Sequence, residues 1–160
     1  MLNDDQINAF DYDDADGSRV PRAAHIRKVN PRSSTPPGKA ESNRHRILRR
    51  GIAYGPEFQP NEQPYGQVPI GDDRDRGLLF LCYQSSLSRG FIFLQQTWAN
   101  AADFPQPRDG EDPIISQALN ERTFSLPPQT THLTMQRWVT TTGGEFFFSP
   151  SITALKQLAS

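Results

Sequence analysis

The large apolar residues of this chain fall mainly after residue 77 and form a few short runs. Residues 78–83 are a continuous apolar run, which is typical of a central strand covered on both faces. The next segment predicts a helix that begins after Ser85 or Ser86 and ends before Asp103. Its core-facing stripe follows the helical spacing i, i+4, i+7 and i+11 through Leu87, Phe91, Leu94 and Trp98.

The first half of the chain has weaker patterns. Residues 1–44 lack any period except for one helical turn at 23–26, and residues 51–76 are predicted to be loop. Alternation over 45–50 predicts a strand. Residues 105–135 are expected to be an excursion with a short helix at 113–121. The 11 glycines and 14 prolines agree with long loops.

The C-terminal region predicts a hairpin and a helix. Residues 137–141 and 145–148 flank Gly143-Gly144, which favours a β-hairpin turn. Ser149 before Pro150 is the pattern of an N-cap followed by proline at the first helical position. The terminal helix then presents one apolar face, made of Ile152, Leu155 and Ala159.

Together these elements predict an α+β fold with a mainly antiparallel sheet and helices on one face. The 160 residues suit one modest unit, in which 1–44 are a loop-rich segment and 45–160 the α+β domain. Only 35% of the residues are hydrophobic, so we expect a small core in the second half, with the first half draped over it.

Several classes of protein are disfavoured by what the sequence lacks. No run approaches the ~18 apolar residues that cross a bilayer, and the acidic start resembles no secretory signal, so we expect a cytoplasmic protein. A single cysteine, Cys82, excludes a disulfide framework, and its apolar strand disfavours a reactive thiolate. The sequence also lacks zinc-hydrolase, Gly-x-Ser-x-Gly and phosphate-loop motifs.

Charge is segregated along the first fifty residues. Residues 1–18 carry six aspartates and no basic residue, whereas 19–50 carry ten of the 17 basic residues and one acid. Such a basic block is compatible with a solvated arm, with a nucleic-acid-binding arm or with arginines that hold an anionic ligand. Interleaved aromatic residues are lacking, which disfavours nucleic acid.

Arg49 carries the most informative charge. If the strand at 45–50 is half buried, Ile47 and Arg49 share its inner face. A buried guanidinium needs an anion, because leaving it unpaired costs several kcal/mol. We therefore expect Arg49 to point inward at an anionic group.

One chemistry needs only a single protein ligand. Iron in a porphyrin already has four nitrogen ligands, so one axial histidine is enough, and the two propionates would use nearby arginines. His25 lies in the basic block, among Arg22, Arg27, Lys28 and Arg32. A lone histidine is also commonly an ordinary surface or core residue, so the residues alone leave both interpretations open.

A family resemblance bears on this choice. Blocks in the same order along nearly the whole chain resemble dye-decolorizing (DyP-type) haem peroxidases. These blocks are 10–12, 16–19, 24–32, 47–57, 75–84, 95–100, 112–115 and 139–148. The resemblance covers only the C-terminal portion of that family, which implies the ferredoxin-like C-terminal half of a dimeric α+β barrel.

The resemblance implies a role for each matching residue. His25 matches the proximal ligand of the haem b iron, and Arg49 matches the distal arginine. Asp112 is the candidate acid that supports the proximal histidine. The expected cofactor-binding residues are His25, Arg27, Arg49, Leu78 and Phe80. Leu78 and Phe80 would wall the distal pocket, although ordinary strand core explains them equally well.

Peroxide cleavage also needs a proton-transfer base. DyP-type enzymes take it from a Gly-x-x-Asp-Gly motif; this sequence lacks that motif, and Asp16-Gly17 does not replace it. The expected function is the haem-binding part of a peroxidase that uses hydrogen peroxide and a reducing substrate. Expected partners are the missing N-terminal half or a homo-oligomer. The alternatives are an inert haem-binding remnant and, if the resemblance is accidental, an α+β domain of another role.

Overall fold

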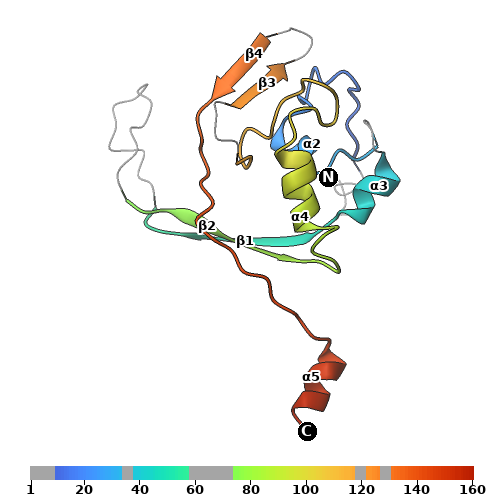
Figure 1. The fold of residues 1–160 in the computed structure, drawn as a ribbon, viewed down its shortest axis with the longest axis vertical. Helices are drawn as coiled ribbons and strands as arrows, with labels where there is room; N and C mark the ends of the chain where they lie inside the picture. The colour runs from blue at the N-terminus through green and yellow to red at the C-terminus, as the bar shows by residue number, and fades with distance from the viewer. Residues whose placement is uncertain (1–9, 34–37, 58–73, 118–121, 127–130) are drawn as a thin grey trace, which may run out of the picture.

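The computed structural model describes residues 10–33, 38–57, 74–117, 122–126 and 131–160 (Figure 1). Its two pairs of strands form two separate antiparallel sheets, β1–β2 and β3–β4. The elements in chain order are α2 (His25–Lys28), α3 (Lys39–Arg44), β1 (Leu48–Tyr54), β2 (Gly77–Tyr83), α4 (Phe91–Phe93), the π-helix η2 (Leu94–Ala99), β3 (Arg122–Leu126), β4 (Thr131–Met135) and α5 (Ile152–Leu158).

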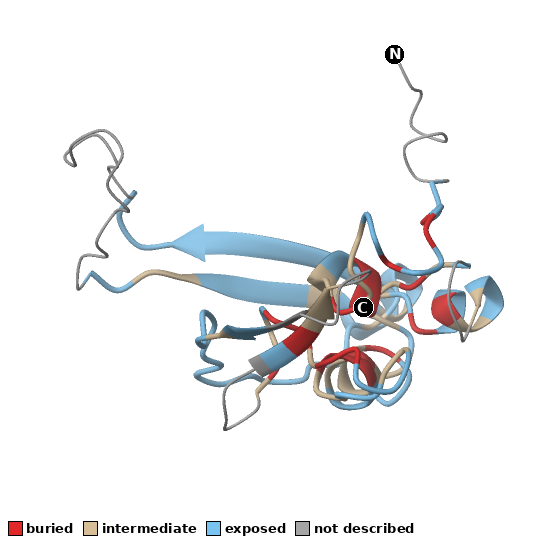
Figure 2. Cartoon of the chain, turned by 90° about the horizontal axis from the view of Figure 1, so that it is seen from above, coloured by how far each residue is buried: buried red, intermediate tan, exposed pale blue. Residues whose placement is uncertain are grey.

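The buried side chains concentrate where residues 10–33 pack against residues 94–117, a region that we call the α2 block (Figure 2). Its apolar members are Tyr12, Ala23, Leu94, Trp98 and Ala99. Its buried polar members are Asp14, Arg27, Lys28, Asp109, Asp112 and Ser116. Both halves of the chain thus form the core, and the expectation of a core confined to the second half is wrong. Buried charges contribute to this core, and an apolar pattern does not reveal them.

The helix predicted after Ser85 or Ser86 begins at Phe91 and continues through η2 to Ala99. The Gln84 side-chain oxygen accepts the backbone N–H of Phe91, so residues 87–90 form turns rather than a first helical turn. Leu94 and Trp98 are buried as predicted, and the helix ends before Asp103.

The β1–β2 sheet is exposed on both faces. The predicted strand at 45–50 lies at Leu48–Tyr54 instead, so residues 51–54 are strand rather than loop. The strand at Gly77–Tyr83 is confirmed, but it is one of two strands and not a covered central strand. Helix α4 lies on one face of this sheet, where the ring centroids of Phe80 and Phe91 are 5.8 Å apart. The far face has no cover from the described residues (Figure 1).

Elsewhere in the first half, α2 lies close to the helical turn predicted at 23–26, whereas α3 was not predicted. Residues 113–115 form only a turn, and residues 118–121 of the predicted short helix lie outside the described residues. The same holds for residues 58–73 of the predicted loop.

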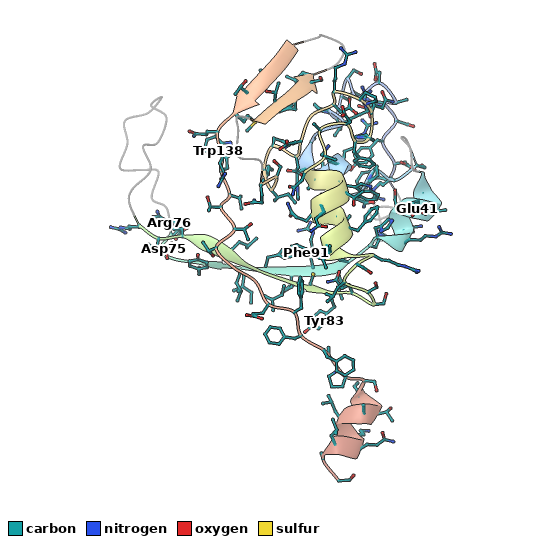
Figure 3. The ribbon with its side chains drawn as sticks, in the orientation of Figure 1. Glu41, Asp75, Arg76, Tyr83, Phe91 and Trp138 are labelled. Atoms are coloured by element: carbon teal, nitrogen blue, oxygen red, sulfur yellow. The ribbon has the colours of Figure 1, made fainter. Side chains whose placement is uncertain are left out.

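The predicted hairpin at 137–148 is wrong. Residues 136–150 contain no strand; they run as an extended segment across the β1–β2 sheet, past Phe91 and Tyr83 (Figure 3). This strand-like sequence pairs with no strand among the described residues, and Phe147 and Phe148 are 86% and 89% exposed. The hairpin in this part of the chain is β3–β4.

The terminal helix is confirmed as α5, but its cap is shifted. Ser151 is the N-cap, and its side-chain oxygen accepts the backbone N–H of Ala154 at 3.1 Å. The predicted cap, Ser149, lies two residues too early. Ile152 and Leu155 share one face of α5 and are 74% and 51% exposed.

Candidate functional site

The structure brings His25 and Asp112 together, although 87 residues separate them in sequence. His25 Nδ1 lies 2.8 Å from Asp112 Oδ2. The carboxylate is fully buried, whereas 36% of the imidazole surface is exposed. Helix α2 orients this ring, and the Ala24 carbonyl accepts the backbone N–H groups of Arg27 and Lys28 at its start.

Asp112 is itself held in place by the turn that follows it. Its Oδ1 accepts the backbone N–H groups of Ile114 and Ile115 at 2.8 and 3.0 Å. The Asp112 N–H donates to the carbonyl of Ala99 at the end of η2. With Oδ1 engaged in this way, Oδ2 is directed at His25. A carboxylate accepts the Nδ1–H of a neutral imidazole, so the lone pair of the ring lies on Nε2.

Two basic residues that flank His25 attach to the loop that carries Asp112. Arg22 donates from Nε to both carboxylate oxygens of Asp109, at 2.9 and 3.0 Å. Lys28 is fully buried, and its Nζ donates to backbone carbonyls of the same loop. Burial lowers the pKa of Lys28 to about 8, although nearby carboxylates, Asp112 first among them, oppose this shift. Sequence reasoning noted these charges but missed their partners, because no pattern connects residues so far apart.

Arg27 points to a different partner from the one expected. Its guanidinium is fully buried and lies 2.8 Å from Asp14 Oδ1, with a second hydrogen bond to the carbonyl of Val20. Burial alone would raise the pKa of Asp14, but the backbone N–H groups of Val20 and Arg19 and the charge of Arg27 outweigh burial and lower it. Binding of a cofactor by Arg27 stays a prediction, while its visible role is to anchor the segment before α2.

The expected distal residues share one face of the β1–β2 sheet. In the register, Arg49 is opposite Cys82, Gly51 opposite Phe80, and Ala53 opposite Leu78. Opposed side chains point to the same face of an antiparallel pair, and alternate residues along a strand share that face. Arg49, Leu78 and Phe80 therefore lie on the face that carries the Phe80–Phe91 contact. Arg49 is exposed, however, so the expectation that this chain alone buries it is wrong.

Among the described residues, the other groups that could carry chemistry are the thiol of Cys82 and the contact of His45 Nε2 with Glu41 Oε1 at 3.0 Å. Burial raises the pKa of the Cys82 thiol, which disfavours its thiolate. Among the described residues, no group of three or more His, Cys, Asp or Glu side chains could hold a metal ion. None of the helices in that same part of the chain combines the length and apolar character needed to span a bilayer.

Much of the basic block is engaged within the protein. Arg19 donates to the carbonyl of Asp13, and Arg32 donates to the carbonyl of Phe10 and lies 3.8 Å from the centre of its ring. Arg22, Arg27 and Lys28 are held as described above. These five residues are structural cross-links rather than parts of a solvated arm.

Comparison with known proteins identifies the family of this chain. Residues 5–107 match the family "Dyp-type peroxidase, C-terminal". The chain is 36% identical to dye-decolorizing peroxidase msp1 of Mycetinis scorodonius, over 96% of this chain and 32% of that protein. It is 40% identical to AauDyP1 of Auricularia auricula-judae, over 92% of this chain and 32% of that protein.

Solved structures give the same answer. The crystal structure of a fungal DyP-type peroxidase from Auricularia auricula-judae superposes with a TM-score of 0.72 at 40% identity. The match covers 91% of this chain and 34% of that one. The chain belongs to the DyP-type peroxidase family and corresponds to its C-terminal, ferredoxin-like α+β portion. It spans about a third of the length of these relatives.

Proposed function

We propose that this chain is the haem-binding C-terminal part of a DyP-type peroxidase, with His25 as the axial ligand of haem b. The observation that carries the proposal is the buried Asp112 carboxylate on His25 Nδ1. This contact leaves the Nε2 lone pair for a metal, which is the arrangement that metal-bound histidines require. The ring is partly exposed, so the donor set fits a haem that supplies the other four nitrogen ligands.

Each residue of the site then has a definite task. When bound, the haem iron supplies the centre at which hydrogen peroxide is reduced. Asp112 holds the Nδ1 proton of His25 and so raises the basicity of the imidazole. Arg49 offers a positive charge and N–H donors to negative charge that develops on a peroxide oxygen. Leu78 and Phe80 lie on the same sheet face as Arg49 and would exclude water around it once that face is covered.

The rest of the reaction is assigned to groups outside this chain. The sequence has no Gly-x-x-Asp-Gly motif, and Arg49 is exposed among the described residues. We propose that an N-terminal portion, as in the longer relatives, covers the sheet and supplies the proton-transfer base. The reducing substrate would be oxidised by that complete assembly. The same two observations favour one alternative, an inert chain that binds haem without turning over peroxide.

Haem ligation is tested by the ferric absorption spectrum of the full chain mixed with hemin. We expect a histidine-ligated spectrum that His25→Ala abolishes and that imidazole restores in a His25→Gly variant. His132→Ala, which removes another of the three histidines, is the control and should leave the spectrum unchanged. Identical spectra for the wild type and His25→Ala would remove the assignment.

Peroxidase activity is tested by adding the N-terminal portion of the Auricularia auricula-judae relative to the haem-loaded chain. The proposal expects turnover well above that of free hemin only when both parts are present, and its loss in Arg49→Ala. Turnover no better than free hemin in the mixture, with haem bound, would favour the inert alternative.

A further inference from the structure

The side chain of Lys28 is an unusual feature of the α2 block, since it is a fully buried cation. Its Nζ donates to the carbonyl oxygens of Ala101, Phe104 and Gly110 at 2.8, 2.5 and 2.6 Å. The Phe104 ring centre lies 5.6 Å from the same atom. A lysine ammonium has three donors, so these three carbonyls use its full hydrogen-bonding capacity.

The three carbonyls belong to one loop, 101–112, which ends at Asp112. Gly110 bridges this loop to Phe124 of β3, an approach that only glycine permits because a Cβ there would clash with the carbonyl oxygen of Thr123. Its φ of 96° is also one that other residues rarely adopt. The carbonyl of Gly110 therefore reaches Lys28 only two residues before the carboxylate that contacts His25.

Lys28 and His25 lie three residues apart, at the two ends of the four-residue helix α2. The Arg22–Asp109 pair joins the same two segments on the other side of His25. The histidine thus lies between two cations, Lys28 in α2 and Arg22 three residues before α2, and both contact the loop that carries Asp112. Because α2 has only four residues, its own hydrogen bonds do little to fix this relation.

We propose that Lys28 is a positioning residue, which holds loop 101–112 against α2 so that the Asp112 carboxylate stays on His25 Nδ1. Through this contact Lys28 sets the tautomer of the imidazole and keeps the lone pair on Nε2. The inference deepens the proposed function, and it rests on that function only in taking Nε2 as the iron-facing atom. The positioning itself is a property of the chain without haem.

The test is the tautomer of His25, read from the ¹⁵N chemical shifts of its ring in the full chain without haem. Spectra recorded at several pH values identify the neutral ring, whose two tautomers differ in their ¹⁵N shifts. In the wild type we expect the Nδ1–H form to dominate. Lys28→Met should lower the ratio of Nδ1–H to Nε2–H about ten-fold or more, because the loop moves and His25 loses its charge-assisted hydrogen bond to Asp112. Asp112→Asn gives the reference for complete loss.

Lys39→Met makes the same change at an exposed lysine of α3 and should leave the ratio unchanged. If Lys28→Met does not fold, Lys28→Gln is measured instead; its amide has two donors for three carbonyls and no charge, so a smaller fall in the ratio is expected. A folded variant at position 28 that keeps the wild-type ratio would overturn the proposal, because lost stability alone does not change a tautomer. A shifted ratio in a chain that fails to bind haem would support the positioning role and count against the haem proposal.

Discussion

The α2 block and the β1–β2 sheet invert the usual distribution of side chains. In the α2 block, Arg27, Lys28 and Asp112 are fully buried and hydrogen-bonded. In the sheet, Leu78 and Tyr83 are 60% and 61% exposed. A buried charge needs its partner within the folded unit, whereas a large exposed apolar surface marks a place where another surface binds.

This difference in burial shows which side of the proposed haem site this chain completes. The side of His25 and Asp112 is closed by contacts between residues of this chain. The side of Arg49, Leu78 and Phe80 is correctly aligned by the strand register but stays open. The ligand side is therefore expected to depend on internal ion pairs, and the peroxide side on a covering partner.

The largest effect is expected from Asp14→Asn, which removes the carboxylate from the buried Arg27 guanidinium. Breaking one side of a buried ion pair costs about 3–5 kcal/mol of unfolding free energy. The measurement is urea denaturation, with Asp13→Asn as control, because Asp13 is the exposed neighbour. Equal stability of the two variants would show that the pair does not hold the α2 block together.

A matched pair of leucine truncations compares the two regions directly. Leu94 is 8% exposed in η2, and Leu79 is 57% exposed in β2. We expect Leu94→Ala to cost about 3 kcal/mol, because it opens a cavity, and Leu79→Ala about 0.5 kcal/mol or less. Urea denaturation measures both. A large loss for Leu79→Ala would mean that the isolated chain covers its sheet in solution.

The buried ammonium of Lys28 predicts a pH dependence of stability. Its pKa is about 8 in the folded chain and 10.5 ordinarily, so the unfolded chain binds this proton more tightly. The unfolding free energy should therefore rise between about pH 8 and pH 10.5, by at most about 3 kcal/mol. The quantity to measure is the wild type minus Lys28→Met difference, in which the other titrating groups cancel. A difference that is flat with pH would contradict the buried charge.

The smallest effect concerns the cap of α5. Ser151→Ala removes the hydrogen bond to the Ala154 N–H and should cost α5 about 1 kcal/mol, whereas Ser149→Ala should cost nothing measurable. Amide hydrogen exchange at Ala154 and Leu155 reports this local stability. Faster exchange in Ser149→Ala and not in Ser151→Ala would show that Ser149 is the N-cap, as the sequence pattern predicts.

Apolar periodicity located the elements that are determined by local sequence pattern alone. The run at 78–83 predicted the position of β2, and the stripe predicted the burial of Leu94 and Trp98, but the central place of the strand and the start of the helix after Ser85 or Ser86 were wrong. Periodicity misplaced the hairpin, since residues 137–148 have strand-like sequence but no strand beside them among the described residues. A strand needs a partner, and the sequence of one chain does not say whether that partner lies within it.

In the site, too, the contacts between residues far apart in sequence were the ones that local pattern did not predict. The pairing of His25 with Asp112 was reached through the family resemblance, and the spacing alone did not indicate it. The cross-links made by Arg22 and Lys28 were not predicted, because a buried cation that binds carbonyls leaves no period in the sequence. Burial of Arg49 was inferred from a half-buried strand, which this chain does not itself provide.

The two-residue period of β1 and β2 restricts how this region can vary. Arg49, Leu78 and Phe80 occupy one face only because Gly51 stands opposite Phe80 and Ala53 opposite Leu78. Inserting or deleting one residue in either strand would exchange its two faces as a whole. Such a change in β1 would move Arg49 to the other face of the sheet, and one in β2 would move Leu78 and Phe80 there, although none of these residues is itself replaced. Length changes are therefore tolerable between these strands and not within them, whereas single substitutions can be accommodated one at a time.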